Sequence, residues 1–246
     1  VFLSSRGLPT YEAKELGLVE AKQEKGEFNL SITVTANEIS DYFKVVRKAA
    51  ELIFPNLEGK MLGRFHGFMR LTSGKMSSRK GNVTTGESLL MDLRGAAKEK
   101  MQERELPNAD KVAEQVAVGA IKYAVLKQGS GKDIIFDPEK SLSLEGDSGP
   151  YVQYAHTRAL SLVREADKAG IKSGNSDAPA SANTLERLLL HFPDVLARAA
   201  KELEPHYVTT YLTELASAFN SWYASERVIG GTSPQYGTLL AWAVEK

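Results

Sequence analysis

The sequence predicts an α/β segment followed by an all-helical segment. Residues 29–36 (NLSITVTA) alternate apolar and hydroxyl side chains, which indicates a strand with one buried face, formed by Leu30, Ile32 and Val34. Residues 37–54 place apolar side chains at helical spacing, which favours a helix capped by Asn37. From about residue 87 onward the pattern is mainly helical. A strand followed by a helix is half of a βαβ unit, so we expect an α/β piece first and a helical bundle after it.

The remaining elements follow from periodicity and turn residues. A second strand is expected at 61–71, interrupted by glycines where a ligand or another backbone segment comes close. Helices are expected at 84–101, 108–129 and 151–170, with a short apolar piece at 133–137. Residues 172–183 (KSGNSDAPASAN) are expected to be a linker or an exposed loop. Further helices are expected at 184–191, 193–203, 206–224 and within 233–246.

Composition excludes several classes of protein. Lys and Arg number 31 and Asp and Glu also number 31, so any contact with a polyanion must be local rather than a general charge attraction. The chain has no cysteine, which excludes disulfides and thiolate metal sites and makes the cytoplasm the simplest compartment. No apolar run approaches the roughly 20 residues of a membrane helix, and we expect no metal site within the protein and a monomer.

The side chains of residues 59–86 that are charged at neutral pH are all positive. This stretch contains six Lys or Arg residues and no Asp or Glu, and the basic residues are Lys60, Arg64, Arg70, Lys75, Arg79 and Lys80. A solvated helix face usually mixes signs. A basic loop rich in glycine and serine, TSGKMSSRKGNV at 72–83, suits a polyanionic ligand, and an ordinary exposed loop is the alternative.

Four segments, in this order, resemble arginyl-tRNA synthetase, a class I aminoacyl-tRNA synthetase. They are GLPTYEAKELGL, HGFMRLTSGKMSSRKGNV, GDSGPYVQYAHTR and PHYVTTYLTELASAFNSWY, and the resemblance covers roughly residues 2 to 246. KMSSR at 75–79 is similar to the family's KMSKS signature. The resemblance implies the second half of a Rossmann-like catalytic domain and a helical anticodon-binding bundle. It also implies arginine, ATP with Mg²⁺, and the tRNA for arginine as substrates and partners.

The resemblance assigns the catalytic charges to the basic loop. Lys75, Arg79 and Lys80 are the catalytic candidates, because positioned cations stabilise the charge that develops on departing pyrophosphate. Ser78 stands where the family signature has its second lysine, so Arg79 or Lys80 would supply that charge. The ATP-binding candidates implied by the resemblance are His66, Gly67, Phe68, Lys75, Met76, Ser77 and Ser78. A packed strand histidine is the alternative for His66.

Arginine recognition is assigned to residues 10–15 (TYEAKE). Tyr11 and Glu15 are four residues apart and share one helix face, and a carboxylate suits a guanidinium group because the pair can be bidentate. The family usually has Asp where Glu15 stands, often has Asp where Arg6 stands and often has Gln where Ile39 stands. A solvated helix acid is the alternative for Glu15.

The candidate tRNA-binding residues lie in the helical segment. They are Gln153, Arg158, Asn220 and Trp222, of which the last two could contact bases by hydrogen bonding and stacking. Tyr151, Tyr154 and Arg158 share a helix face, and core packing is the preferred use of the tyrosines. Phe219 and Tyr223 are likewise expected in the core.

The family's other ATP signature, HIGH, is absent from these 246 residues. We therefore expect a C-terminal portion of the enzyme, with residues 1–145 belonging to the catalytic domain and 146–246 to the anticodon-binding domain, and we expect this portion alone to be inactive. The alternatives are a stand-alone tRNA-binding module without catalysis, another class I synthetase, and a generic nucleotide-binding protein with a basic loop.

Overall fold

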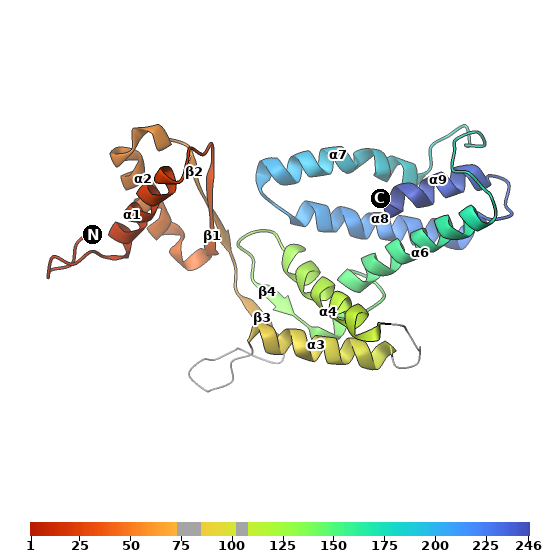
Figure 1. Ribbon diagram of the computed structural model, residues 1–246, viewed down its shortest axis with the longest axis horizontal. Coiled ribbons are helices and arrows are strands. Elements are labelled where there is room, and N and C mark those ends of the chain that lie inside the picture. Colours follow the sequence, from red (N-terminus) through yellow and green to blue (C-terminus); the bar gives the residue numbers. More distant parts are fainter. Residues whose placement is uncertain (73–84, 102–107) are drawn as a thin grey trace. The chain divides into compact units, whose positions relative to one another are not determined.

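The computed structural model describes residues 1–72, 85–101 and 108–246. The chain divides into two compact units, one of Val1–Met69 with Ser130–Asp133 and one of Arg70–Gly129 with Ile134–Lys246. Strands and helices alternate at the start of the chain and helices dominate the rest (Figure 1). The expected fold class, α/β followed by all-α, is confirmed.

The first unit contains a two-stranded parallel sheet and two helices packed on each other. Its elements are α1 (Tyr11–Glu24), β1 (Ser31–Ala36), α2 (Ser40–Ile53) and β2 (Met61–His66), with short 3-10 turns at Asn37–Ile39 and Pro55–Leu57. The two strands pair in parallel from Ser31 with Met61 to Ala36 with His66, so both end at the same edge. Val19 of α1 and Ala50 of α2 belong to one buried cluster. Because α2 links two parallel strands, β1, α2 and β2 form a βαβ unit.

The strand predicted at 29–36 is present, but the prediction of its buried face is wrong. Ile32 and Val34 are 42% and 71% exposed, whereas Thr33 and Thr35 are partly buried. Alternation shows that a strand has two different faces, and it does not say which face the neighbouring elements cover. α2 begins at Ser40, after a 3-10 turn, so Asn37 is not its cap.

The second unit combines two short strands with the helices. Its elements are β3 (Met69–Leu71), which starts at the unit boundary, α3 (Gly86–Met101), α4 (Ala109–Leu126), β4 (Ile134–Phe136), α5 (Pro138–Ser141), α6 (Gly149–Lys168), α7 (Thr184–Glu202), α8 (His206–Ser225) and α9 (Pro234–Glu245). The strand predicted at 61–71 is therefore two strands, β2 and β3. Gly67 and Phe68 separate β2 from β3. Before this break β2 pairs with β1, and after it β3 pairs with β4.

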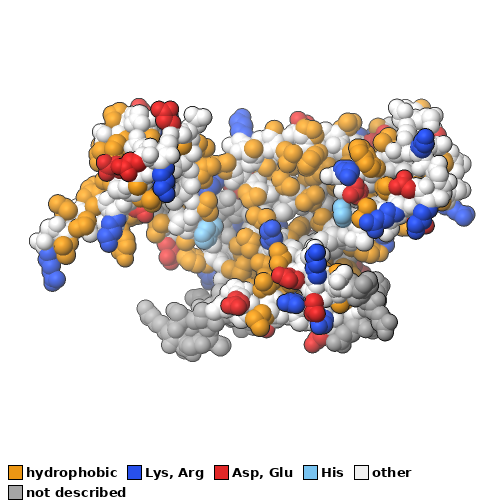
Figure 2. Space-filling view, viewed as in Figure 1, with side chains coloured by type: hydrophobic (Ala, Val, Ile, Leu, Met, Phe, Trp, Pro, Cys, Tyr) orange, Lys and Arg blue, Asp and Glu red, His pale blue; other side chains and the backbone are white. Residues whose placement is uncertain are grey.

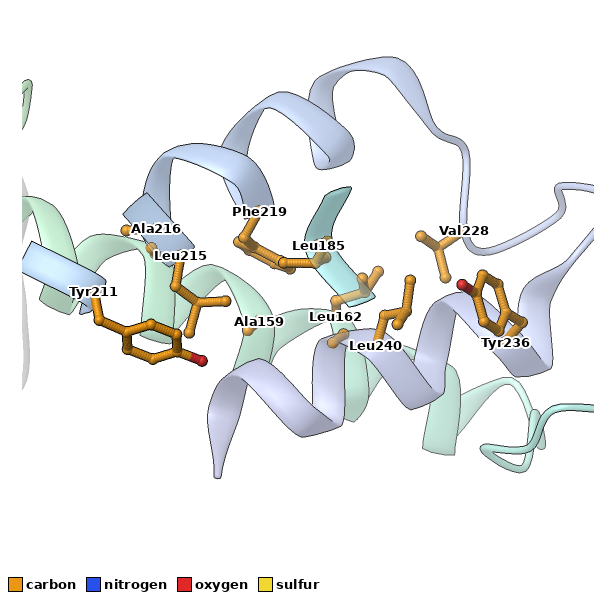
Figure 3. Packing of buried hydrophobic residues seen from close by; sticks show 12 residues of the cluster. Ala159, Leu162, Leu185, Tyr211, Leu215, Ala216, Phe219, Val228, Tyr236 and Leu240 are labelled. Atoms are coloured by element: carbon orange, nitrogen blue, oxygen red, sulfur yellow. The ribbon is translucent and has the colours of Figure 1, made fainter. Parts of the chain in front are cut away.

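The core of the second unit lies between α6, α7, α8 and α9. Phe219 and Leu215 of α8 point toward Leu185 of α7, Leu162 of α6 and Leu240 of α9 (Figure 3). Phe219 is fully buried, as predicted. Burying a side chain of this size contributes roughly 1.5–3 kcal/mol, so this cluster is the main source of stability for the bundle.

The segment GDSGPY has a structural role in addition to its resemblance. Ser148 caps α6, because its hydroxyl accepts a hydrogen bond from the backbone N–H of Tyr151 (3.2 Å). A Cβ on Gly149 would lie 2.4 Å from the carbonyl oxygen of Gly119 on α4, so only glycine lets these helices approach. Val112, Val116 and Val125 are only partly buried, and small residues fill the interface, namely Ala113, Ala117, Ala120 and Ala124, next to Tyr123.

A single helix, α7, replaces the two helices predicted at 184–191 and 193–203. Pro193 lies inside it and removes one backbone hydrogen bond, which is why the sequence indicated a break. Two features favour the continuous helix. Asn183 and Glu186 form a reciprocal capping box at its start, and Phe192 stacks on Tyr211 of α8 with ring centroids 5.4 Å apart. Packing against α8 therefore outweighs the local cost of the proline.

Residues 172–183 form a loop, which hydrogen bonds attach to the start of α9. The backbone N–H of Gly174 donates to the carbonyl of Gln235 (3.1 Å), and Asp177 Oδ1 accepts from the backbone N–H of Tyr236 (2.9 Å). A carboxylate at a helix N-terminus is favoured by the free N–H groups and the helix dipole. The loop is thus joined to the bundle at its own Asp177.

Candidate substrate and RNA sites

The first unit places the candidate segment His66–Phe68 at one edge of the parallel strand pair. Ala36, the last residue of β1, pairs with His66, the last residue of β2. The chain continues from these two points into the 3-10 turn Asn37–Ile39, which precedes α2, and into Gly67 and Phe68. In open α/β sheets, ligands bind outside the carboxyl ends of the strands. This edge of the first unit is therefore the place to look for a small-molecule site.

The segment His66–Phe68 is held in place by residues 132 and 133. The Phe68 N–H donates to Asp133 Oδ1 (2.9 Å), and a Cβ on Gly67 would lie 2.3 Å from the carbonyl oxygen of Lys132. Gly67 thus permits a close approach of the chain's own backbone. His66 Nδ1 lies 2.8 Å from the carbonyl of Gly67, and because a carbonyl only accepts, this contact places the proton on Nδ1. In the neutral imidazole Nε2 is then an acceptor at the exposed end of the strand, and Phe68 is 39% exposed.

The candidate arginine-binding residues lie on the first turns of α1. Tyr11 is 78% exposed, with the Nζ of Lys14 5.4 Å from its ring centroid. Glu15 is partly buried and has no hydrogen-bond or ion-pair partner among the residues that the structure describes. A partly buried carboxylate without a partner is available to a cation. Tyr11 and Glu15 therefore differ in exposure, and Glu15 is the less exposed of the two.

The basic loop carries six of the candidate residues for ATP binding and catalysis. Lys75, Met76, Ser77, Ser78, Arg79 and Lys80 lie outside the described residues. Their predicted roles in binding ATP and in catalysis therefore remain predictions from the sequence.

In the second unit, Arg158 of α6 lies between two tyrosine rings. Its guanidinium carbon is 4.5 Å from the ring centroid of Tyr154 and 4.8 Å from that of Tyr223 on α8. Arg158 Nη1 donates to Asn220 Oδ1 (2.9 Å), and Nη2 donates to the hydroxyl of Tyr154. Tyr154 and Tyr223 are 40% and 37% exposed, so the prediction that they are core residues is wrong. We refer to Tyr154, Arg158, Asn220 and Tyr223 as the arginine–tyrosine cluster.

The other two tRNA candidates lie elsewhere in this unit. Gln153 joins α6 to α4, because its Nε2 donates to the carbonyl of Gln115 (3.1 Å). Its buried Oε1 has no hydrogen-bond partner among the described residues. Trp222 is partly buried against the main core, with its ring centroid 5.8 Å from that of Phe219. The structure thus brings Arg158 and Asn220 together and gives Gln153 and Trp222 packing roles.

Sequence reasoning named Arg158 and Asn220 as candidates and assigned Tyr154 and Tyr223, which flank Arg158 in the structure, to the core. The spacing of Tyr154 and Arg158, four residues apart on one helix, was the signal that could have suggested the first stack. Nothing in the sequence links Arg158 of α6 to Tyr223, which lies 65 positions after it. Only the packing of α6 on α8 brings the second ring to Arg158.

The charge distribution agrees with local rather than general contacts. On the face shown in Figure 2, basic and acidic side chains are intermixed over the described surface. Within the described ranges, no group of three or more His, Asp or Glu side chains could hold a metal ion. The helices of those ranges also include none that is long and apolar enough to cross a membrane.

A parallel βαβ unit, joined in the chain to a helical bundle, agrees with a class I aminoacyl-tRNA synthetase, and the family models identify the chain as part of one. Residues 1–138 match the family model described as tRNA synthetases class I (R), catalytic domain, and residues 152–243 match the DALR anticodon binding domain. The chain belongs to the arginyl-tRNA synthetase family, of which it carries part of the catalytic domain and the DALR anticodon-binding domain.

Known relatives agree with this assignment. The chain is 32% identical over 243 residues to the arginine–tRNA ligase of Treponema denticola, a match that covers 94% of this chain and 41% of that protein. It is 35% identical over 223 residues to the enzyme of Clostridium acetobutylicum, covering 88% and 39%. Its fold matches Thermus thermophilus arginyl-tRNA synthetase with a TM-score of 0.83 and 27% identity, over all of this chain and 48% of that one. The chain thus spans less than half of each of these relatives.

Proposed function

We propose that this chain supplies the arginine-binding carboxylate, part of the ATP site and the anticodon-side contacts of an arginine–tRNA ligase in the cytoplasm. In the proposed reaction the carboxylate of arginine attacks the α-phosphate of ATP, which forms arginyl-adenylate and releases pyrophosphate. The arginyl group then passes to the terminal adenosine of the tRNA for arginine. The family membership carries this proposal, and Glu15, which has no hydrogen-bond or ion-pair partner among the described residues, supports it.

Each described candidate residue of the first unit has a role that its chemistry supports. Glu15 would bind the guanidinium group of arginine, and Tyr11 would border it. His66 Nε2 would accept a hydrogen bond from the adenine amino group, and Phe68 would border the ring. Gly67 would act indirectly, by allowing the segment to lie against Lys132.

The basic loop would stabilise the triphosphate. Lys75 and either Arg79 or Lys80 would neutralise the negative charge that grows on the departing pyrophosphate, and Met76, Ser77 and Ser78 would border the nucleotide. Mg²⁺ would enter bound to the ATP phosphates, because the described residues offer no cluster of metal ligands.

The arginine–tyrosine cluster would contact unpaired tRNA bases. Single-stranded RNA is recognised by stacking on aromatic rings and arginine guanidinium planes and by hydrogen bonds to base edges. Tyr154 and Tyr223 each keep more than a third of their surface exposed beside Arg158. Gln153 and Trp222 would support this surface through their packing.

Exchange of label between pyrophosphate and ATP tests the proposed function and distinguishes it from a stand-alone tRNA-binding module. We expect the 246-residue chain alone, with arginine and tRNA present, to show no detectable exchange of label between pyrophosphate and ATP, because it lacks the HIGH signature. We expect the full-length gene product to show arginine-dependent exchange. Exchange by the isolated chain would contradict the proposed division of the ATP site. A full-length protein that binds tRNA without exchange would favour the stand-alone tRNA-binding module.

Arg158→Ala tests the RNA-binding role of the arginine–tyrosine cluster. We expect it to weaken binding of the tRNA for arginine by about 5- to 20-fold, since base stacking on such platforms contributes roughly 1–3 kcal/mol per base. Filter binding at fixed salt measures the change. Arg164→Ala is the control, because Arg164 is an exposed arginine of the same helix, with no aromatic partner among the described residues. Equal losses in the two variants would mean that only general charge matters.

A further inference from the structure

The peptide unit between Gly67 and Phe68 is hydrogen-bonded at both of its polar ends. Its N–H, which belongs to Phe68, donates to Asp133 Oδ1 (2.9 Å), and its carbonyl oxygen, which belongs to Gly67, lies 2.8 Å from His66 Nδ1. Among the described residues no peptide bond is cis, and in a trans peptide unit the N–H and the C=O point in opposite directions. The acceptor of the N–H therefore also fixes the direction in which the C=O points.

The backbone of residues 132 and 133 covers Gly67. A Cβ at Gly67 would lie 2.3 Å from the carbonyl oxygen of Lys132 and 2.6 Å from the backbone nitrogen of Asp133, so the two backbone segments touch with no side chain between them. Gly67 is buried, whereas His66 and Phe68 on either side of it are exposed. Asp133 belongs to the same compact unit as these residues, although it follows Phe68 by 65 positions. The contact thus supports the segment from one side and leaves the neighbouring side chains accessible to a ligand.

The direction of the Gly67 carbonyl decides which ring nitrogen of His66 carries the proton. A carbonyl oxygen only accepts, so Nδ1 donates to it and Nε2 of the neutral ring is left as the acceptor. If the carbonyl turned away, the ring would lose the contact that selects this tautomer. Asp133 thus acts on the imidazole of His66 through one rigid peptide unit.

We propose that Asp133 is a positioning residue of the ATP site, which holds the peptide unit between Gly67 and Phe68 so that His66 presents Nε2 as an acceptor to the amino group of adenine. The adenine amino group is a donor, so it can pair only with a ring nitrogen that carries no proton. This role of Asp133 rests on the proposed function, since it takes His66 as an adenine-binding residue.

The kinetic test uses the full-length gene product that contains this chain. Arginine-dependent exchange of label between pyrophosphate and ATP gives the Michaelis constants of Asp133→Ala, Asp133→Asn, His66→Ala and the Asp133→Ala/His66→Ala double variant. We expect Asp133→Ala to raise the constant for ATP about 3- to 10-fold, the scale of one hydrogen bond to a charged group, and that for arginine less than about twofold. His66→Ala should raise the ATP constant by a similar factor.

Two of these variants separate positioning from a general structural role. Asp133→Asn should keep the ATP constant within about twofold of the unmodified protein, because its amide oxygen still accepts from the Phe68 N–H. In the His66→Ala background, Asp133→Ala should add less than about twofold, since Asp133 acts through the imidazole.

Nitrogen NMR of the protein labelled in its histidine rings, without ATP, measures the tautomer directly. At about pH 8.5, where imidazole rings are neutral, the unmodified protein should show His66 protonated on Nδ1, and Asp133→Ala should add the form protonated on Nε2. The spectrum of His66→Ala identifies the signal. A ring that keeps its tautomer in Asp133→Ala would refute the role of Asp133.

The kinetic control is Asp167→Ala, which removes an exposed carboxylate of α6 in the other compact unit and should leave both Michaelis constants unchanged. If His66→Ala raises the ATP constant and Asp133→Ala behaves like Asp167→Ala, the role of Asp133 is refuted and the ATP site stands. If neither His66→Ala nor Asp133→Ala changes it, the ATP site itself is refuted. Equal losses of ATP and arginine affinity in Asp133→Ala, or an Asp133→Asn variant that behaves like Asp133→Ala, would also refute the proposal.

Discussion

Replacing Lys75, Arg79 and Lys80 with glutamine, one at a time in the full-length protein, should lower the rate of arginyl-adenylate formation by roughly 10²- to 10³-fold at the position that contacts the pyrophosphate. Negative charge moves onto the pyrophosphate only as the reaction proceeds. A cation that meets this charge is therefore worth more in the transition state than in the bound ground state, so its loss lowers the rate. Single-turnover formation of arginyl-adenylate measures this rate directly.

The same variants should leave arginine binding nearly intact, because these side chains act on the phosphates. Lys172→Gln is a suitable control, since Lys172 is exposed in the loop 172–183 and has no proposed role. Comparing Arg79→Gln with Lys80→Gln also decides which of the two residues supplies the positive charge that the family signature has at the position of Ser78. If all three positions could be neutralised without loss of rate, the stretch would be an ordinary solvated loop.

Glu15→Gln should raise the Michaelis constant for arginine by about 10- to 100-fold and change the maximal rate only a few-fold. The carboxylate and the guanidinium group are paired already in the ground state, so removing the charge mainly weakens binding. Hydrogen bonds to charged groups contribute roughly 1.5–3 kcal/mol, which sets this range. Steady-state pyrophosphate exchange at varied arginine concentration measures both constants.

Glu15→Asp is the matched comparison, because it keeps the charge and shortens the side chain by one methylene. We expect a smaller rise than for Glu15→Gln, since the negative charge is retained. An unchanged arginine constant in Glu15→Gln would mean that Glu15 is a solvated helix acid.

The general course of the fold could be predicted because periodicity is a local property. The strand at 31–36, the helices α2, α4, α6 and α8 and the change from α/β to helices all follow from apolar spacing. Pro193 shows the limit of this reasoning. It is a local signal for a break, and the continuous helix α7 depends on Phe192 stacking on Tyr211 and on the packing against α8.

The same distinction between local signals and long-range packing applies to the candidate site residues. Glu15, His66 and Arg158 could be named from their residue types and from the segments that resemble the family, because those signals lie in short stretches. Tyr223 could not be assigned, since it meets Arg158 only across two packed helices. Long-range packing also decided that Gln153 joins α6 to α4.

By itself the sequence determined the class of fold, the family and the presence of one basic loop without acidic residues, because these depend on residue order along short segments. The tertiary structure decided which side of β1 is covered, why Gly67 and Gly149 must be glycines and which tyrosines flank Arg158. The physical reason is that alternation and spacing define faces, whereas the neighbour of each face depends on how helices and strands far apart in the chain pack together.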